Sequence, residues 1–476
     1  MSLQVTPPVI RWLVLATFIV ILNETLMINA IPQLMQSLEI SARAAQWLST
    51  AFMLTMAAVI PVTGWFLQRV TTRSAFTTAM ITFCAGTAIA AVAPSFEVLL
   101  AGRIVQAAGT AVMMPLLMTT LMTVVAEQDR GRVMGNVTLA MSVAPALGPA
   151  VSGVLLDMGS WRLMFVLVLP IAVAITVAAL TKLENVGEPH AGEIDWWSFV
   201  LAGTGFAALV YGLSQAGTGS WATPILIASA GLATVAVFVR RQLRLQRTGA
   251  PLLDLRTLTH RAFRLSLVLM SVAFMAMLGS MILLPLYLQD VRGLSPLQTG
   301  LLVMPGGLAM GVLGPRVGRW FDAVGGRPLV IPGSAGIAVA LTALTQLSAT
   351  TPYVVVLGIH VLLMVCLAAV FTPVFSLGLG DLPRHLYSHG SSILGTVQQV
   401  SAAFGTALVV TVMSSRATAL VEAGTDPLAA LMGGMRWAFV VGAVLSLVVL
   451  AVAVRLPGRP TAPLHGAAPE PEPLTA

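Results

Sequence analysis

Residues 12–31 read WLVLATFIVILNETLMINAI, an apolar run that carries a single acid, Glu24. The hydrocarbon core of a bilayer is about 30 Å thick and is crossed by a helix of roughly 20 apolar residues. The run therefore predicts a membrane-spanning helix with a carboxylate inside it. An ionised side chain at the centre of such a helix costs about 3 kcal/mol on insertion scales. We therefore expect Glu24 to serve a function rather than the fold.

The composition indicates that most of the protein's surface faces lipid. Of 476 residues, 57% are hydrophobic and 9% are charged, whereas soluble proteins carry about 25% charged residues. The formal net charge of +7 does not indicate nucleic-acid binding, because most basic residues lie in short loops between apolar runs. We predict a multi-pass protein of the cytoplasmic membrane.

Fourteen runs are long enough to span a bilayer, and they fall into groups of six, two and six. The runs begin near Trp12, Trp47, Ala75, Leu99, Val133, Leu163, Trp197, Pro224, Leu265, Leu301, Leu329, Val354, Ile393 and Trp437. The predicted fold is all-helical, with six-helix bundles over residues 1–181 and 263–456. Residues 182–262 form a linker with two additional spans, and the proline-rich residues 457–476 are predicted to be a disordered cytoplasmic tail.

The basic residues predict the orientation. With the N-terminus in the cytoplasm, 19 of the 25 Lys and Arg residues fall in inside loops or tails, five fall in outside loops, and Arg103 falls within a span. Cytoplasmic loops of membrane proteins carry such an excess. An even number of spans then places both termini in the cytoplasm.

Two loops at equivalent positions in the six-helix groups are similar to each other. Residues 64–73 read GWFLQRVTTR after the second span, and residues 318–327 read GRWFDAVGGR after the tenth. Each loop begins with Gly at a helix end and finishes with Arg. Matched loops at matched positions indicate an internal duplication, which is a common plan in secondary transporters.

Both loops resemble the signature loop of the major facilitator superfamily, G-x-L-x-D-R-x-G-R-R. The second copy keeps the acid, Asp322, whereas the first has Gln68 and Thr71 at the acidic and second glycine positions. In that family the acid helps to latch the two halves in the outward-open form. The resemblance implies gating or conformational roles for Gly64, Arg69, Arg73, Gly318, Asp322, Gly325 and Arg327.

Further motifs resemble the fourteen-helix drug:proton antiporter branch of this family. APALGPAVSG in the fifth span is similar to the antiporter motif through Gly148, Pro149 and Gly153, which implies a conformational role for all three. SWRLMF at 160–165 and DWWSF at 195–199 are similar to the same branch. LNETL at 22–26 is most similar to lincomycin-resistance-type multidrug exporters.

Two interpretations of Glu24 are open. It is either a structural carboxyl, which is neutral and hydrogen-bonded in the core or high enough in the helix to reach water, or the proton acceptor and cation-attracting group of a central cavity. We expect the second, because apolar surroundings disfavour the ionised form of a carboxyl and allow it to bind a proton near neutral pH. Many relatives have Asp at the position of Asn23, about 100° around the helix from Glu24. Either the two residues share the role or Glu24 faces elsewhere, and we include both in the predicted substrate site.

Arg103 is the other charge within a span. LLAGRIVQAAGT in the fourth span resembles the family's R-x-x-Q-G-type motif through Arg103 and Gln106. Gln106 and Thr110 follow Arg103 at i+3 and i+7, so the three form a polar stripe on one helical face. We predict that Arg103 tunes proton binding by Glu24 as the distance between them changes. The alternative is an arginine that snorkels to the membrane surface or tethers helices.

The remaining predicted substrate contacts are flexible or polar residues in or near the spans. Methionine is suited to a pocket that accepts many shapes, and polar groups in the second half are candidates to line a cavity. The predicted substrate contacts are Asn23, Glu24, Met27, Gln106, Thr110, Met113, Met114, Tyr287, His360, Gln398 and Gln399.

The sequence contains no phosphate-binding loop of Walker form and no metal-ligand spacing. We therefore expect no catalytic residue, no cofactor and no metal, with transport driven by the proton gradient. The expected partners are hydrophobic or cationic small molecules, protons and membrane lipids, which can be anionic at the cytosolic face. We expect a monomer.

These observations predict a proton-coupled exporter of hydrophobic or amphipathic, cationic drugs that works by alternating access. An exporter of one metabolite, peptide or lipid-like compound on the same scaffold is the first alternative. A membrane-embedded transferase is a second, with Asp254, His260 and Asp290 as its best candidate residues. A non-transporting receptor is the third, and the duplicated plan disfavours it.

Overall fold

The computed structural model describes residues 7–186, 195–215, 222–247 and 251–457. Fourteen helices in this part of the chain are long and apolar enough to cross a membrane, which confirms the predicted spans. They are α1 (Pro8–Leu26), α3 (Ala42–Arg69), α4 (Thr72–Ala91), α5 (Phe96–Val124), α6 (Arg130–Asp157), α7 (Arg162–Lys182), α8 (Trp196–Ser214), α9 (Ala222–Leu245), α10 (Arg261–Leu286), α11 (Pro296–Val324), α12 (Arg327–Leu344), α13 (Tyr353–Gly380), α14 (Tyr387–Glu422) and α15 (Pro427–Ala453).

Short elements join these helices. They are α2 (Ile31–Ser37), the 3₁₀ helices η1 (Met27–Ala30), η2 (Glu127–Asp129), η3 (Leu255–Thr259) and η5 (Arg384–Leu386), and the π-helical η4 (Tyr287–Val291). The spans are helical because a helix satisfies its backbone hydrogen bonds internally where lipid offers none. Of the predicted tail, residues 458–476 lie outside the described residues.

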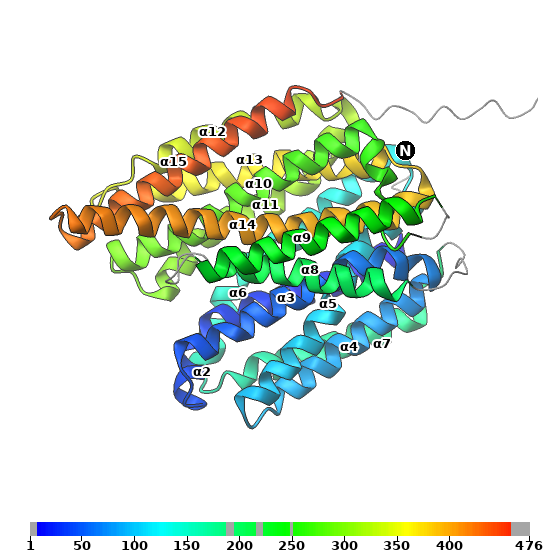
Figure 1. Ribbon diagram of the computed structural model, residues 1–476, viewed down its shortest axis with the longest axis horizontal. Helices are drawn as coiled ribbons and strands as arrows, with labels where there is room; N and C mark the ends of the chain where they lie inside the picture. Colours follow the sequence, from blue (N-terminus) through cyan, green and yellow to red (C-terminus); the bar gives the residue numbers. More distant parts are fainter. Residues whose placement is uncertain (1–6, 187–194, 216–221, 248–250, 458–476) are drawn as a thin grey trace, which may run out of the picture.

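The long helices pack as two groups with a helix pair beside them. Helices α1 and α3 to α7 pack on one another, and so do α10 to α15 (Figure 1). We call these groups the N-half and the C-half. The division of the chain at residues 181 and 262 remains a prediction.

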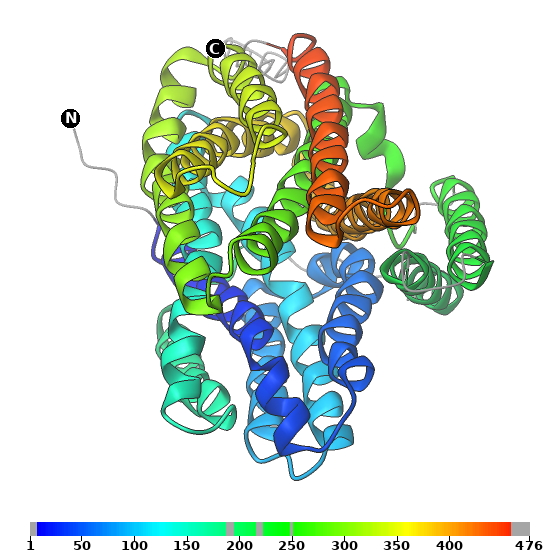
Figure 2. The same ribbon diagram turned by 90° about the vertical axis from the view of Figure 1, so that its left-hand side faces the viewer.

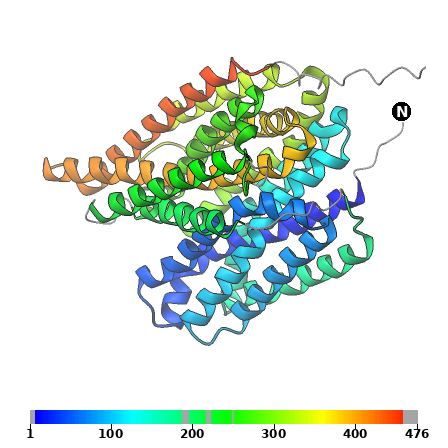
Figure 3. The ribbon, with the colours of Figure 1, turned by 45° about the vertical axis from the view of Figure 1, so that its right-hand side comes forward.

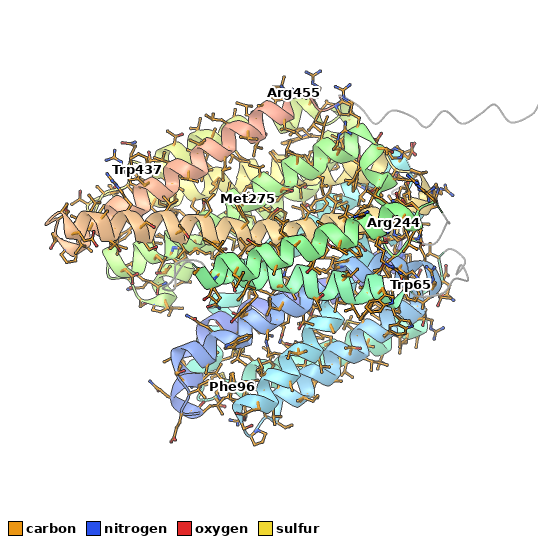
Figure 4. The ribbon with its side chains drawn as sticks, viewed as in Figure 1. Trp65, Phe96, Arg244, Met275, Trp437 and Arg455 are labelled. Atoms are coloured by element: carbon orange, nitrogen blue, oxygen red, sulfur yellow. The ribbon has the colours of Figure 1, made fainter. Side chains whose placement is uncertain are left out.

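The start of α1 and the end of α15 lie at the same end of the bundle, as an even number of crossings requires (Figures 1 and 3). We call this the termini end and the opposite end the far end. Trp65 and Arg244 lie toward the termini end, and Phe96 and Trp437 lie toward the far end (Figure 4). The assignment of the termini end to the cytoplasm remains a prediction.

The two halves meet along two seams. At the first seam, α6 and α11 cross closely because glycines face each other: GRVMG at 131–135 and GPRVG at 314–318. A Cβ on Gly135 would lie 2.6 Å from Pro315 Cα, and one on Gly131 would lie 2.5 Å from the Gly318 carbonyl oxygen. Small residues allow helix backbones to approach this closely in a membrane. At the second seam, α3 packs against α14.

The helix pair α8 and α9 lies beside the second seam (Figure 2). Helix α8 packs against both α3 and α14. Val210 of α8 contacts Ala57 of α3 and Ala403 of α14, and Tyr211 stacks on Trp47 of α3 with ring centroids 5.4 Å apart. The added helices therefore contact both halves at the place where α3 and α14 meet.

Polar contacts join α8 to α9, and one of them extends to the chain that follows α9. Arg241 of α9 donates two hydrogen bonds of 2.7 Å to Asp195, just before α8. Gln242 Nε2 donates to Ser198 Oγ at 2.6 Å, and the backbone N–H of Leu253 donates to Gln242 Oε1 at 3.1 Å. The hydrogen bonds from Arg241 lower the pKa of Asp195. The two helices are thereby fixed to each other at the termini end.

Candidate functional site

Glu24 lies in the last turn of α1, close to the 3₁₀ helix η1 that continues the chain. Its side chain is partly buried and interacts electrostatically with Arg103 of α5. The ion pairs within 4.0 Å in the described part of the chain are Arg130–Glu127, Arg132–Asp129, Arg241–Asp195 and Arg256–Asp254. Glu24 is therefore near a cation without being neutralised by direct contact.

Arg103 is held in a polar network within the N-half. Its side chain is 1% exposed. Its Nη1 donates hydrogen bonds to Asn23 Oδ1 at 3.3 Å and to Gln106 Oε1 at 2.5 Å. Gln106 Nε2 donates in turn to Thr87 Oγ1 at 2.7 Å. The network fixes one edge of the guanidinium from α1 and from α5 itself.

Neighbouring residues of α1 take different roles in this arrangement. Asn23 is 2% exposed and accepts a hydrogen bond from Arg103, whereas Glu24 is partly exposed. The two side chains point in directions about 100° apart. The structure therefore places Asn23, and not Glu24, as the hydrogen-bond partner of Arg103 on α1.

The other predicted contacts of the N-half are less exposed than expected. Thr110 donates its hydroxyl to the carbonyl oxygen of Gln106 at 3.0 Å, within its own helix. Met27 is 2% exposed and Met113 is 1% exposed, and both belong to the hydrophobic core. Met114 is partly exposed and so remains the best placed of the predicted methionines.

Gln398 and Gln399 of α14 are both partly buried. Gln398 follows Ser391 by two turns on the same helix face, and Ser391 meets Thr119 of α5 with hydroxyl oxygens 2.8 Å apart. The buried Nε2 of Gln398 has no hydrogen-bond partner among the described residues. Gln398 therefore offers a free donor on the face of α14 that meets the N-half.

His360 and Tyr287 lie elsewhere in the C-half. The His360 ring packs against α11 beside Gly306, where an added Cβ would lie 2.6 Å from Nε2. The Tyr287 hydroxyl donates to the Ser348 carbonyl oxygen at 2.7 Å and accepts from Arg292 Nη1 at 3.1 Å. The polar group of Tyr287 is thus used at the far end of its own half. Its predicted role in substrate binding receives no support from this position.

The halves are hydrogen-bonded to each other in the part of the bundle nearer the termini end. We call these contacts the closed interface. The hydroxyl oxygens of Thr63 and Ser392 are 2.7 Å apart, and those of Thr138 and Thr372 are 2.8 Å apart. The other pairs are Thr119–Ser391, Gln68–His385, Arg130–Tyr387 and Asp322 with the backbone of Gly131 and Arg132. Contacts from several helices therefore seal this end.

The two signature-like loops contribute to the closed interface in different ways. Asp322 accepts hydrogen bonds of 2.8 Å from the backbone N–H groups of Gly131 and Arg132, at the N-terminus of α6. Gln68 instead donates from Nε2 to the carbonyl oxygen of His385 at 2.9 Å, just before α14. Both loops bridge the halves, but only the second does so with a carboxylate.

The remaining residues of the first loop differ in position. Gly64 faces α14, where an added Cβ would lie 3.1 Å from Ser392 Oγ. Arg69 lies over the ring of Trp65 in its own helix, with Cζ 4.4 Å from the ring centroid. Arg73 is exposed, and its backbone N–H donates to Asn185 Oδ1 at 3.2 Å. Of these three residues, Gly64 is the one placed at the seam between the halves.

The second loop shows a similar division. Gly318 faces Gly131 so closely that a Cβ would overlap its carbonyl oxygen. Gly325 ends α11 with φ of 84°, a conformation that favours glycine. Arg327 Nη2 donates to the Val454 carbonyl oxygen at 3.1 Å and so joins α12 to α15 within the C-half.

The antiporter-like motif in α6 lies next to the candidate proton site. Gly148 faces Thr25 of α1, and a Cβ there would overlap the threonine side chain. This glycine therefore lets α6 approach α1 beside Glu24. Gly153 is different, because the nearest atom to its Cβ would be Leu297 Cδ1 at 3.8 Å. The side chain of Pro149 lies outside the described part of the chain.

The residues considered for a transferase do not assemble. Asp254 lies near the termini end, where Arg256 Nη2 is 2.5 Å from its Oδ2. Asp290 lies at the far end, in η4 after α10. Within the described ranges, no group of three or more His, Cys, Asp or Glu residues is placed to hold a metal ion.

Several residues of the site were not identified from the sequence. Phe52 of α3 covers the Arg103 guanidinium, and Thr87 of α4 accepts from Gln106. The hydroxyl pairs of the closed interface were also missed. A single Phe, Ser or Thr in an apolar helix is common, so no local signal separates these residues from their neighbours.

Comparison with known proteins agrees with this architecture. A family model described as Major Facilitator Superfamily matches residues 13–406. The "Uncharacterized MFS-type transporter YcnB" of Bacillus subtilis is 38% identical over 453 residues, which cover 94% of this chain and 95% of that protein. The "Lincomycin resistance protein LmrB" of Listeria monocytogenes is 38% identical over 448 residues, which cover 93% of this chain and 94% of that protein.

The fold also resembles that of a solved structure. The human organic anion transporter MFSD10 (TETRAN) superposes with a TM-score of 0.69, and the match covers 94% of this chain and all of that one. The sequence identity is 15%, so this similarity concerns the fold alone.

Proposed function

Because the chain belongs to the major facilitator superfamily, we propose that it exports hydrophobic or amphipathic cations from the cytoplasm in exchange for protons, by alternating access. Family membership establishes a multi-pass membrane transporter, and the members of this family are transporters rather than enzymes. The proton coupling, the direction and the substrate class are our proposal. Relatives that carry the names of lincomycin and multidrug resistance proteins support the substrate class.

The single observation that carries the proposal is the state of Glu24. Glu24 is a partly buried residue of a membrane helix, and it lies near a buried arginine but outside ion-pair distance. A carboxylate in direct contact with Arg103 would remain ionised, and one far from any cation would remain protonated. A carboxylate between these limits can bind and release a proton. It can also attract a cationic substrate once the proton has left.

Proton and substrate then compete for one carboxylate. When the site opens to the outside, Glu24 binds a proton and releases the cation. When it opens to the cytoplasm, the proton leaves and another cation takes its place. The free amide donor of Gln398 and the partly exposed Met114 supply polar and adaptable contacts for the rest of the molecule.

The closed interface provides the contacts that must form and break during alternating access. If the termini end faces the cytoplasm, as the arginine distribution predicts, the structure is the form that is closed to the cytoplasm. Opening requires the contacts of Asp322, Gln68 and the hydroxyl pairs to break. Each of these hydrogen bonds contributes about 1 kcal/mol net. The free energy of ligand binding is therefore large enough to offset their loss when the interface opens.

The proton gradient provides enough free energy. One elementary charge that crosses 100 mV contributes about 2.3 kcal/mol, and each pH unit contributes about 1.4 kcal/mol. One proton at 100 mV and one pH unit therefore supports an accumulation of several hundredfold for an uncharged load. A monovalent cation exchanged for one proton moves no net charge and uses the pH difference alone.

The test uses purified protein in proteoliposomes with an imposed pH gradient and ethidium as the probe. Wild type should move ethidium against its gradient, and Glu24→Gln should lose this movement. Glu97→Gln, which alters an exposed acid in the first turn of α5, should transport like wild type. Normal pH-driven transport by Glu24→Gln would overturn the proton assignment. A wild-type protein that moves no cation, yet releases protons on addition of one metabolite, would favour the alternative exporter.

A further inference from the structure

The Arg103 guanidinium lies against the face of an aromatic ring that belongs to another helix. Its Cζ is 4.2 Å from the ring centroid of Phe52 in α3. Both side chains are 1% exposed. A cation over an aromatic face is attracted by the negative face of the ring, and the attraction is stronger when the contact is desolvated. The ring of Phe52 is therefore a cation–π partner of Arg103, and unlike a carboxylate it does not bind protons.

The hydrogen bonds of Arg103 to other side chains engage one side of its guanidinium. Both of its hydrogen bonds to other side chains start from Nη1, and they end on the neutral amides of Asn23 and Gln106. Its buried Nε has no hydrogen-bond acceptor in the described part of the chain. The guanidinium is thus free on one side, and Glu24 is the carboxylate with which it interacts electrostatically.

Other charged groups near α5 lie away from this contact. Glu97 is exposed in the first turn of α5. Cys84 of α4 faces Thr176 of α7. The described charged or titratable residues of the other helices packed on α5 lie toward helix ends: Arg11 in α1, Arg69 in α3, Arg73 in α4, Arg130, Arg132 and Asp157 in α6, and Tyr387, His389, Arg416 and Glu422 in α14. Among these charged groups, Glu24 is the one that interacts electrostatically with Arg103, so Glu24 and Phe52 are the two groups that compete for its free side.

We propose that Phe52 is a positioning residue for proton coupling: its ring holds the Arg103 guanidinium back from direct contact with Glu24, so that the carboxyl can bind a proton. The inference rests on the proposed role of Glu24. Without the ring, the unpaired Nε edge is free to turn toward Glu24 and form an ion pair. Such a pair favours the ionised carboxylate, and the proton is then bound only at lower pH.

The test reads the protonation of Glu24 directly and needs no substrate. Dicyclohexylcarbodiimide reacts with protonated carboxyls in apolar surroundings, and intact-protein mass spectrometry measures the adduct at each pH. Glu24→Gln defines the background. In Phe52→Leu, the pH of half-maximal labelling should move to a more acidic value by about one unit, or tenfold in proton affinity. Phe52→Tyr keeps the aromatic face and should restore the wild-type profile.

Two further variants separate position from packing. Phe83→Leu removes a fully buried phenylalanine of α4 in the same half, so it should lower stability without shifting the labelling profile. Trifluorophenylalanine introduced at position 52 by amber suppression keeps the shape of the ring and weakens its negative face. It should reproduce the acidic shift even if Phe52→Leu fails to fold.

The outcomes distinguish this inference from the proposed function. An unchanged profile, or a shift to alkaline pH, in both Phe52→Leu and the fluorinated protein would overturn the role of Phe52 and leave that of Glu24 intact. A wild-type protein in which Glu24 takes no label at any pH would overturn the proton assignment itself.

Discussion

The carboxylate of Asp322 in α11 accepts a hydrogen bond of 2.8 Å from the backbone N–H of Gly131, across the seam between the two halves. Its second oxygen accepts from the next N–H of α6 at the same distance. The first N–H groups of a helix have no partner within the helix and carry the positive end of its dipole. Asp322 therefore satisfies two such groups and places a negative charge where the helix favours one.

The equivalent contact in the other half is made without a charge. Gln68 donates to the His385 carbonyl oxygen at 2.9 Å, a neutral hydrogen bond that is about half as strong as one to an ionised group. The contacts of Asp322 and Gln68, which we call the latch, are thus asymmetric. We expect the seam at α6 and α11 to be held more firmly than the seam at α3 and α14.

The first prediction concerns this latch. Asp322→Asn keeps the shape but loses the charge, so the closed interface should weaken by about 1–2 kcal/mol, or roughly tenfold in the closed-to-open ratio. The reporter is Leu386→Cys, a buried position at the end of η5 and directly before α14, in a protein that lacks Cys84 and Cys366. Its reaction rate with N-ethylmaleimide should rise severalfold. Asp157→Asn, which removes a charge at the far end of α6, should leave the rate unchanged; an equal rise there would argue against a specific latch.

The second prediction concerns the glycine crossing of α6 and α11. Gly318→Ala introduces a Cβ that overlaps the Gly131 backbone, so the helices must separate at a cost of about 1–3 kcal/mol. The melting temperature in detergent should fall by several degrees. Gly153→Ala is the matched control, because its Cβ meets no atom closer than 3.8 Å and alanine favours a helix. Equal effects of the two substitutions would show that α6 and α11 are farther apart at Gly318 than in this structure.

The third prediction concerns pH and the α8–α9 pair. Hydrogen bonds from Arg241 hold the pKa of Asp195 below its ordinary value of 3.8. The contact therefore stabilises the pair above the unfolded pKa of about 3.9, and the stabilisation is lost as pH falls through the lowered value. Because the pair is partly exposed, its contribution is at most about 1 kcal/mol. The protection factor for hydrogen exchange at the start of α8, which corrects for the intrinsic pH dependence of exchange, should fall below about pH 4 in wild type, and Asp195→Asn should show the lower protection factor already at pH 7.

The control for that experiment is Asp157→Asn, at the far end of α6. It should leave the exchange of α8 unchanged at both pH values. If Asp195→Asn also exchanged like wild type at pH 7, the contact with Arg241 would contribute nothing to the stability of the helix pair.

The fourth prediction concerns the packing of α8 on α3. A Cβ on Gly203 would lie 3.8 Å from the Cβ of Ala58, which is about the mean separation in disulfides. Ala58→Cys with Gly203→Cys should therefore form a disulfide under mild oxidation, detectable by peptide mass spectrometry without reductant. Ala58→Cys with Gly358→Cys should remain reduced, because a Cβ at position 358 meets nothing within 4 Å. A reduced Ala58–Gly203 pair would place α8 away from this seam.

Features that depend on one stretch of chain were predictable. Each span needs its own apolar run to enter lipid, so all fourteen could be counted before any packing was known. Glu24 and Arg103 were identified for the same reason, since an ionisable residue inside such a run is visible locally. The similarity of the loops at 64–73 and 318–327 is also a property of the sequence alone.

The partners of these residues required the tertiary structure. Asn23 and Arg103 are 80 positions apart, and only the packing of α1 on α5 brings them together. Phe52 reaches Arg103 from a third helix, and Tyr287 turns toward Ser348 instead of the halves' shared seam. A helix in lipid is apolar on most faces, so hydropathy does not reveal its rotation about its own axis. That rotation, set by contacts between distant segments, decides which polar atom meets which.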